Sequence, residues 1–186
     1  MLASLNRPAD AARKLVLMRH AKSAWPDVPD HDRPLARRGE RDAPVMGRWL
    51  RTAGHRPDQV LCSTARRARE TWQLAQARLG CTPPVRFDDR VYTDPVRRLL
   101  DLIRQVDPSL GTVLLVGHDP AIPELALMLA NSRAPALIER MRVKFPTGAI
   151  AVLEFSGTWA GLAPESARLR WFVTPRDLRA RGRDSR

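Results

Sequence analysis

The sequence predicts an α/β domain built on a mostly parallel sheet. Short apolar runs that are typical of buried strands alternate with stretches whose apolar residues recur at helical spacing. No internal repeat interrupts this alternation. The chain of 186 residues suits a single domain, and it is long enough to bury a core without disulfides or structural metals.

The expected elements follow one another in the order that this fold class requires. Strands are expected at 15–19, 59–62, 85–87, 112–116, 148–155 and 168–173. Helices are expected at 37–52, 65–79, 95–106 and 120–131. The last two strands are joined by a connection that is too short for a crossover helix, so this pair is predicted to be antiparallel. The domain is expected to span 15–174, between a flexible basic leader at 1–14 and a frayed, basic, polar tail at 175–186.

The formal net charge is +12, and arginine dominates the basic residues. An excess of this size favours an anionic partner, such as a phosphorylated protein or a nucleotide. An arginine-rich composition whose charges are simply solvated would give the same net charge. Aromatic residues are not interleaved with a basic stripe, which argues against nucleic acid as the main partner.

Neither an export signal nor a membrane span is predicted. No apolar run approaches the ~20 residues that a transmembrane helix needs, and residues 1–14 carry charges without an apolar segment. The expected location is therefore the cytoplasm, with no membrane partner. The two cysteines, Cys62 and Cys81, are too few and too far apart for a disulfide framework or a metal site, so both are expected to be plain thiols.

Two histidines directly follow predicted strands. His20 comes after the strand at 15–19, and His118 after the strand at 112–116. If these strands are neighbours in the sheet, the two side chains meet at its carboxyl edge, where open α/β sheets bind ligands. A single histidine at a strand end is more often structural. The pairing, with Arg19 beside one histidine and Gly117 beside the other, favours a functional site.

A third candidate segment lies at the junction between a strand and a helix, at residues 63–71. A helix amino terminus offers free N–H groups and a partial positive charge to an anion. Arg67 adds a planar, two-pronged donor that suits phosphate oxygens, and Ser63 is placed to cap the helix. The alternative is a solvated helical face with an ion pair between Arg66 and Glu70.

Together these motifs resemble the histidine phosphatase superfamily, which includes the phosphoglycerate mutases. The resemblance lies in the ordered set Arg19-His20-Ala21, Ser63-x-x-x-Arg67-Ala68-x-x-Thr71 and Gly117-His118, and it extends over about residues 15–155. The chain is most similar to the small SixA-type phosphohistidine phosphatases, because it is short and carries Arg19-His-Ala-Lys-Ser-Ala-Trp25 and Gly117-His-Asp-Pro120. This resemblance implies a three-layer α/β/α sandwich of the phosphoglycerate mutase type.

The resemblance also implies roles for the candidate residues. His20 would be the nucleophile that forms a transient phosphohistidine, kept neutral by neighbouring cations, with its second nitrogen donating to a backbone carbonyl. Arg19, Arg67 and His118 would surround the phosphoryl oxygens. No metal or cofactor is required. The expected activity is hydrolysis of phosphohistidine on proteins; the alternatives are a small-molecule phosphomonoesterase or mutase, or a non-catalytic phosphate-binding scaffold.

The roles of other residues near the proposed site are not yet assigned. Phosphomonoesterases of the superfamily place a glutamate after the third strand, where this chain has Asp88 and Asp89. Asp89 is the first choice for the general acid and Asp88 the second, while both could equally be solvated loop residues. Lys22 and Arg33 are candidates to extend the anion site, or are solvated loop residues themselves.

Overall fold

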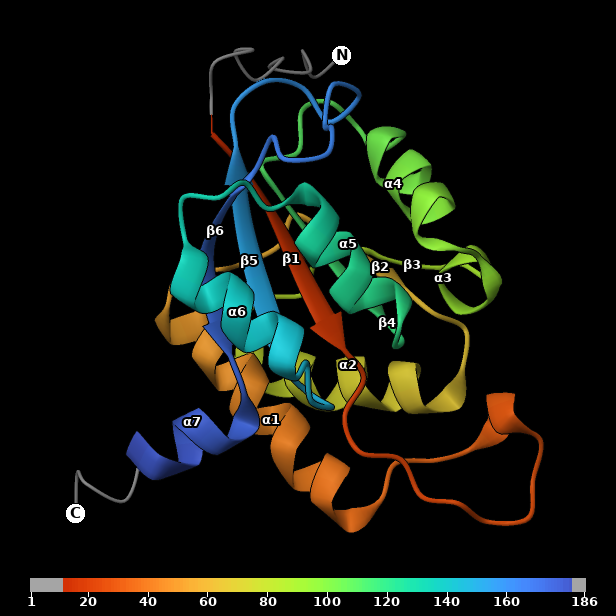
Figure 1. Ribbon diagram of the computed structural model, residues 1–186. Coiled ribbons are helices and arrows are strands. Elements are labelled where there is room, and N and C mark those ends of the chain that lie inside the picture. The colour runs from red at the N-terminus through yellow and green to blue at the C-terminus, as the bar shows by residue number, and fades with distance from the viewer. Residues whose placement is uncertain (1–11, 182–186) are drawn as a thin grey trace.

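The computed structural model describes residues 12–181 and shows a six-stranded sheet between two layers of helices (Figure 1). The strands are β1 (Arg13–Arg19), β2 (Gln59–Cys62), β3 (Val85–Phe87), β4 (Thr112–Gly117), β5 (Ile150–Phe155) and β6 (Arg168–Val173). The helices are α1 (Arg37–Thr52), α2 (Arg66–Leu79), α3 (Arg90–Thr93), α4 (Val96–Arg104), α5 (Ala121–Leu129), α6 (Pro135–Val143) and α7 (Pro175–Arg181), with a short 3-10 helix η1 (Asp30–Asp32). The predicted three-layer α/β/α architecture is confirmed.

The strands lie in the order β3-β2-β4-β1-β5-β6. The first four of these are mutually parallel, whereas β5 is antiparallel to both β1 and β6. The predicted antiparallel final pair is therefore present. Arg19 lies opposite Gly117 in the register of β1 and β4, so the residues that follow these two strands emerge side by side at one edge of the sheet.

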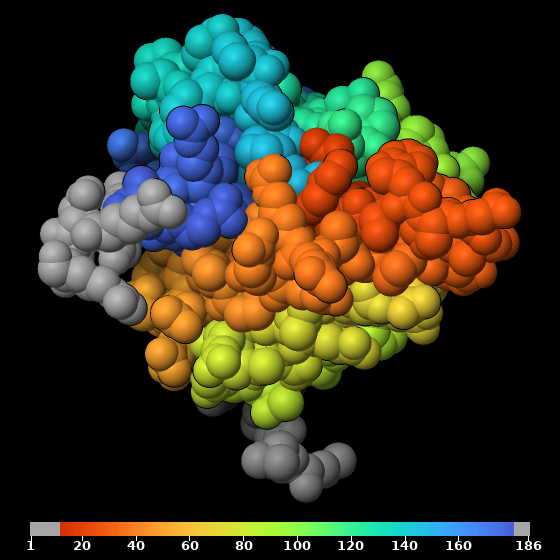
Figure 2. Space-filling view, turned by 90° about the horizontal axis from the view of Figure 1, so that it is seen from below, coloured from red at the N-terminus to blue at the C-terminus, as the bar shows by residue number. Residues whose placement is uncertain are grey.

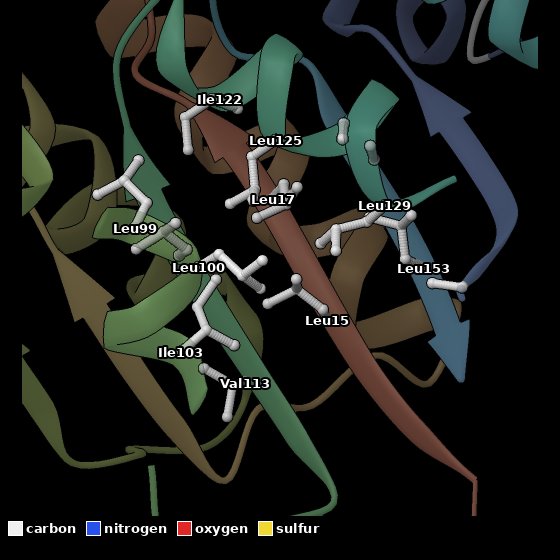
Figure 3. Close-up of a cluster of buried hydrophobic side chains, with 14 of the residues drawn as sticks. Leu15, Leu17, Leu99, Leu100, Ile103, Val113, Ile122, Leu125, Leu129 and Leu153 are labelled. Carbon is white, nitrogen blue, oxygen red and sulfur yellow. The ribbon is translucent and has the colours of Figure 1, made fainter. Parts of the chain in front are cut away.

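The apolar run of β1 is buried on both faces of the sheet. Leu15 and Leu17 pack under α4, α5 and α6, and Figure 3 shows Leu17 beside Leu125. Val16 and Met18 point to the opposite face and pack in the cluster covered by α1 and α2. Successive strand side chains alternate between faces, and a strand covered on both sides is apolar throughout. This explains why the run is continuous rather than alternating.

The amino-terminal boundary differs from the prediction. β1 begins at Arg13, two residues before the expected strand. The Arg13 side chain is buried, and its guanidinium donates hydrogen bonds to the carbonyl oxygens of Pro108 and Gly157. A basic residue that is anchored in this way belongs to the folded domain, so the leader predicted at 1–14 is wrong for residues 13 and 14. Residues 1–11 lie outside the described chain.

The carboxyl-terminal segment is also better ordered than expected, because 175–181 forms α7 instead of a frayed tail. Arg179 donates to the buried carboxylate of Asp42 on α1. Asp177 accepts from the backbone N–H of Thr174 at 2.9 Å and pairs with Arg140 on α6 at 2.9 Å. These contacts attach the last described helix to both helical layers. Residues 182–186 lie outside the described chain.

Two further differences concern helices. The helix α6 is not expected from the sequence, because Met141 is its one buried residue and the apolar periodicity is weak. The loop expected at 88–92 contains the start of α3. Pro44 lies inside α1, which nevertheless runs without a break from Arg37 to Thr52.

Candidate active site

A cavity of about 260 Å³ opens at the carboxyl edge of the parallel strands. Figure 2 looks onto this edge, where the red and orange chain after β1 lies beside the cyan end of α6. The cavity is lined by Arg19, His20, Lys22, Ser23, Trp25, Arg33, Arg67, His118, Asp119 and Thr147. The structure thus brings together Arg19, His20, Lys22, Arg33, Arg67 and His118, but neither Asp88 nor Asp89.

His20 has the geometry of a neutral imidazole with one free lone pair. Its side chain is buried, with 8% of the residue exposed, and Nδ1 donates to the carbonyl oxygen of Ala21 at 2.7 Å. Because a carbonyl can only accept, Nδ1 carries the proton and Nε2 carries the lone pair. Burial, together with the nearby guanidiniums of Arg67, Arg19 and Arg33, lowers the pKa of His20 to about 4. The ring is therefore neutral at pH 7.

His118 lies beside His20, with ring centroids 5.0 Å apart and planes inclined by 54°. Its Nε2 is 2.7 Å from the hydroxyl of Ser63, and that hydroxyl accepts the N–H of Ala65 at 3.2 Å. We assign the hydroxyl proton to the hydrogen bond with Nε2, which places the proton of the neutral ring on Nδ1. In the described protein Nδ1 is buried without a partner, so it is available to an acceptor in the cavity.

Burial and the proximity of His20 and Arg67 lower the pKa of His118 to about 3. This ring is also neutral at pH 7, so it offers a hydrogen bond and not a charge. The residue that caps α2 also differs from the prediction. Ala65 is the N-cap residue of α2, and Ser63 orients His118 while accepting the Ala65 N–H.

Arg67, in the first turn of α2, is held by the loop that follows β1. Its guanidinium donates from Nη1 to the backbone carbonyl of Asp30 at 2.5 Å and from Nη2 to the Asp30 carboxylate at 2.9 Å. The same carboxylate accepts from Arg33 at 2.7 Å and from the hydroxyl of Tyr92 at 2.9 Å. The hydrogen bonds from Arg33, Tyr92 and Arg67 lower the pKa of Asp30 to about 2. An ionised Asp30 therefore orients two of the arginines that line the cavity.

Arg33 is part of the cavity wall and not a solvated loop residue. It is buried, and it donates from Nε to the Ala24 carbonyl at 3.0 Å and from Nη2 to the Ser23 hydroxyl at 2.7 Å. The guanidinium carbon lies 3.2 Å from the ring centroid of Trp25, an arrangement typical of a cation–π contact. Lys22, in contrast, is exposed at the rim of the cavity.

Arg19 is fixed by partners that the sequence did not identify. Nη1 donates to the carbonyl of Phe145 at 2.7 Å, and Nη2 lies 3.4 Å from a carboxylate oxygen of Asp119. Asp119 also lines the cavity. Asp119 could have been predicted from its position directly after His118. Asp30 could not, because no local feature distinguishes it from the other aspartates of its loop.

The two candidates for the general acid lie outside the residues that line the cavity. Asp88 accepts hydrogen bonds from Arg90 and Arg86, which hold the pKa of its carboxyl well below the usual range. A carboxylate that is held in its ionised form is a poor proton donor, so these ion pairs do not favour the second-choice assignment to Asp88. Asp89 is exposed and accepts a hydrogen bond from the Thr64 hydroxyl.

Within residues 12–181, no cluster of three or more His, Cys, Asp or Glu side chains is placed to hold a metal ion. Cys62 and Cys81 are both free thiols, and burial raises the pKa of Cys62 to about 12. None of the helices in this range is long and apolar enough to cross a bilayer.

Comparison with known proteins agrees with the geometry. Residues 15–93 match the model of the histidine phosphatase superfamily (branch 1). An uncharacterized protein of Mycobacterium tuberculosis is 45% identical over 162 residues, which cover 86% of this chain and 100% of that protein.

Two solved structures extend the comparison. A candidate phosphohistidine phosphatase SixA from Nakamurella multipartitia is 38% identical, with a TM-score of 0.76, over 89% of this chain and 97% of that chain. A second candidate SixA, from Agrobacterium tumefaciens, is 30% identical, with a TM-score of 0.73, over 88% of this chain and 98% of that chain. With the motifs and the paired histidines at the sheet edge, these similarities show that the chain belongs to the histidine phosphatase superfamily, in its SixA-like branch.

Proposed function

We propose that this protein hydrolyses phosphohistidine on protein substrates through a phosphorylated His20 intermediate, without a metal or cofactor. The observation that carries the proposal is the state of His20. Its Nδ1 is committed to the Ala21 carbonyl, and its neutral ring lines a cavity shared with Arg19, Arg67 and His118. A free lone pair beside two guanidiniums is the arrangement that phosphoryl transfer to nitrogen requires.

In the first step, Nε2 of His20 attacks the phosphorus of the substrate. A new N–P bond forms while the N–P bond of the substrate phosphohistidine breaks, and its electron pair stays on the departing imidazole. Arg19 and Arg67 balance the negative charge of the phosphoryl oxygens, and the N–H of neutral His118 supplies a hydrogen bond. The hydrogen bond from Nδ1 of His20 to Ala21 stabilises the positive charge that the phosphorylated ring acquires.

In the second step, water attacks the phosphorus of phospho-His20. The N–P bond breaks with its electron pair returning to Nε2, and the products are inorganic phosphate and neutral His20. The proton of the attacking water passes to phosphate and solvent. The same three donors serve both steps, because the charge develops on the same phosphoryl oxygens.

The leaving group favours a phosphoramidate over an ordinary phosphate ester. When the second nitrogen of the substrate ring is protonated, the ring leaves as neutral imidazole, whose conjugate acid has a pKa near 6.5, whereas an alkoxide needs a positioned acid. Of the described residues, Asp119 is the one carboxylate that lines the cavity, and it faces Arg19. Asp89, the first-choice acid, would have to move into the cavity to donate a proton, and it remains a prediction.

The dimensions of the cavity also support a protein substrate. A volume of about 260 Å³ is smaller than the ~300–1,000 Å³ of pockets that enclose a whole small organic ligand. It accommodates a phosphoryl group with the adjoining ring, while the rest of the substrate lies outside. A small phosphate ester is the second candidate, because the same donors would bind its phosphoryl group.

The test uses a protein phosphorylated on histidine by phosphoramidate, and p-nitrophenyl phosphate as a generic ester. We expect His20→Ala to lose at least ~10³-fold in phosphate release from both substrates. The matched control is His55→Ala, which removes a histidine away from the cavity. The wild type should also yield an acid-labile, alkali-stable phosphoenzyme.

The other functions predict different results. Turnover of the ester alone would identify a small-molecule phosphatase. Phosphate binding without turnover of either substrate would identify a scaffold. Equal turnover by wild type and His20→Ala would contradict the assignment of the nucleophile.

A further inference from the structure

We infer that a groove beside the phosphate cavity binds an extended, acidic segment of the protein substrate. This inference rests on the proposed function, since the segment is part of the phosphorylated protein. The groove, called here the α6–α7 groove, has a volume of about 690 Å³ and lies between α6, the end of β6 and α7. Val143, Pro146, Phe172 and Pro175 give it an apolar lining, and Val143 is 76% exposed.

The α6–α7 groove adjoins the phosphate cavity, because Thr147 lines both. Met18 of β1 pairs with Ile150 of β5, which in turn pairs with Val173 of β6. The end of β6 is therefore two strand spacings, ~10 Å, from the strand that carries His20. An extended chain advances ~3.3 Å per residue, so residues about three positions from the phosphohistidine would reach the groove.

The free edge of β6 favours an extended occupant. In the described sheet β6 is the outermost strand, so one side of its backbone has no strand partner. A second hollow, of about 470 Å³, lies along Arg170 to Val173 and shares Phe172, Arg140 and Asp177 with the α6–α7 groove. An extended polypeptide can lie along such an edge and use its backbone hydrogen-bonding groups.

The charges at the groove favour an acidic occupant. Lys144 and Arg176 are both exposed there, and neither has a carboxylate within ion-pair distance among residues 12–181. Arg140 and Asp177, which also line the groove, pair with each other at 2.9 Å. Glu139 is the one other carboxylate in this lining. Two unpaired cations beside an apolar floor suit a segment in which acidic and apolar residues are mixed.

Binding is tested with a fluorescein-labelled, unphosphorylated peptide that carries glutamates three to five residues on each side of a central histidine. Fluorescence anisotropy compares it with the same peptide carrying glutamines. We expect the wild type to prefer the glutamate peptide, and Lys144→Glu/Arg176→Glu to weaken its binding about tenfold, because two favourable contacts become repulsive. The preference should disappear in 0.5 M salt, since exposed charges are screened.

The matched control is Arg51→Glu/Arg78→Glu, which makes nearly the same change in net charge. These exposed arginines are near the carboxyl ends of α1 and α2, away from the residues that line both cavities. If the groove is the binding surface, the Kd of this variant for the glutamate peptide should change less than about twofold. An equal loss in both variants would show that overall charge, and not the groove, attracts the peptide.

Turnover separates this inference from the proposed function. Both peptides are phosphorylated on histidine, and kcat/KM is compared with that for p-nitrophenyl phosphate. In Lys144→Glu/Arg176→Glu, kcat/KM should fall about tenfold for the glutamate peptide. It should fall less than about twofold for the glutamine peptide and for the ester.

The remaining outcomes separate a failure of the proposed function from a failure of the groove inference. If neither phosphopeptide is hydrolysed, the proposed function fails, while anisotropy still decides whether the groove binds acidic chain. If the two phosphopeptides are hydrolysed with equal kcat/KM and bind equally, the groove does not select acidic segments.

Discussion

The guanidinium of Arg67 is bonded twice to Asp30, once at the backbone carbonyl and once at the carboxylate. The two residues belong to different elements, since Arg67 lies in the first turn of α2 and Asp30 begins η1 in the loop after β1. This pair therefore fixes the position of the loop relative to the helix. It also leaves part of the guanidinium to face the cavity, where Arg67 is a lining residue.

Asp30→Asn tests this positioning. The substitution keeps the side-chain size but replaces the ionised acceptor of Arg33, Arg67 and Tyr92. We expect kcat/KM to fall by about 10–100-fold, because small displacements of phosphate-binding groups are costly. Steady-state kinetics with p-nitrophenyl phosphate measures the effect. Tyr92→Phe, which removes one of these hydrogen bonds, should lose less; unchanged kinetics in Asp30→Asn would contradict the positioning role.

Ser63→Ala tests the tautomer of His118. Without the hydroxyl, Nε2 loses its hydrogen bond at 2.7 Å, and the proton is no longer directed to Nδ1. We expect kcat to fall by about tenfold, in line with other groups that orient a site histidine. Ser63→Thr keeps a hydroxyl and should retain more activity than Ser63→Ala. Equal activity of Ser63→Ala and wild type would show that the ring is oriented by its packing alone.

The lowered pKa of His20 predicts that the ring stays neutral in weak acid. Burial is the main cause, and it disfavours the charged ring, so the side chain should stay neutral from pH 8 down to about 5 and gain its proton near pH 4. Nitrogen-15 NMR of labelled histidine measures this directly and avoids the ionisation of the substrate phosphate near pH 6. A midpoint close to 6.5 for His20 would contradict the prediction. A histidine in the urea-unfolded chain provides the ordinary reference.

Gly47→Ala tests the packing of α1 on α2. A Cβ atom at Gly47 would lie 2.0 Å from the carbonyl oxygen of Ala75, which is backbone and cannot rotate away. We expect the free energy of unfolding to fall by about 2 kcal/mol or more, as for other overpacked sites. Urea denaturation measures the change. Gly161→Ala, whose Cβ would meet its nearest neighbour at 3.4 Å, should be close to neutral.

The parts of the site that the sequence predicts are those that depend on strand order. His20 and His118 each follow an apolar run, and parallel neighbours bring such residues to one edge. The contributions of Asp30 and Asp119 were not predicted. Their roles depend on hydrogen bonds and ion pairs between loops and distant elements, which leave no periodic signal in the chain.

The same distinction applies to the fold. The helix at 37–52 and the strand at 59–62 agree with the prediction to the residue, because the helix has apolar residues at helical spacing and the strand is a short apolar run. The helix α7 was expected to be a tail because its order depends on Arg179 reaching the buried Asp42 of α1. No window of neighbouring residues contains that contact.

The position of β1 in the sheet has a consequence for synthesis. Of the described strands β1 is made first, yet Lys14 pairs with Thr112 on one side and with Glu154 on the other. Its apolar centre must therefore wait for most of the described chain before either neighbouring strand exists. During that interval Leu15 to Met18 are exposed to other nascent chains and to chaperones. The centre of β1 thus depends on protection until β4 and β5 have been made and pair with it.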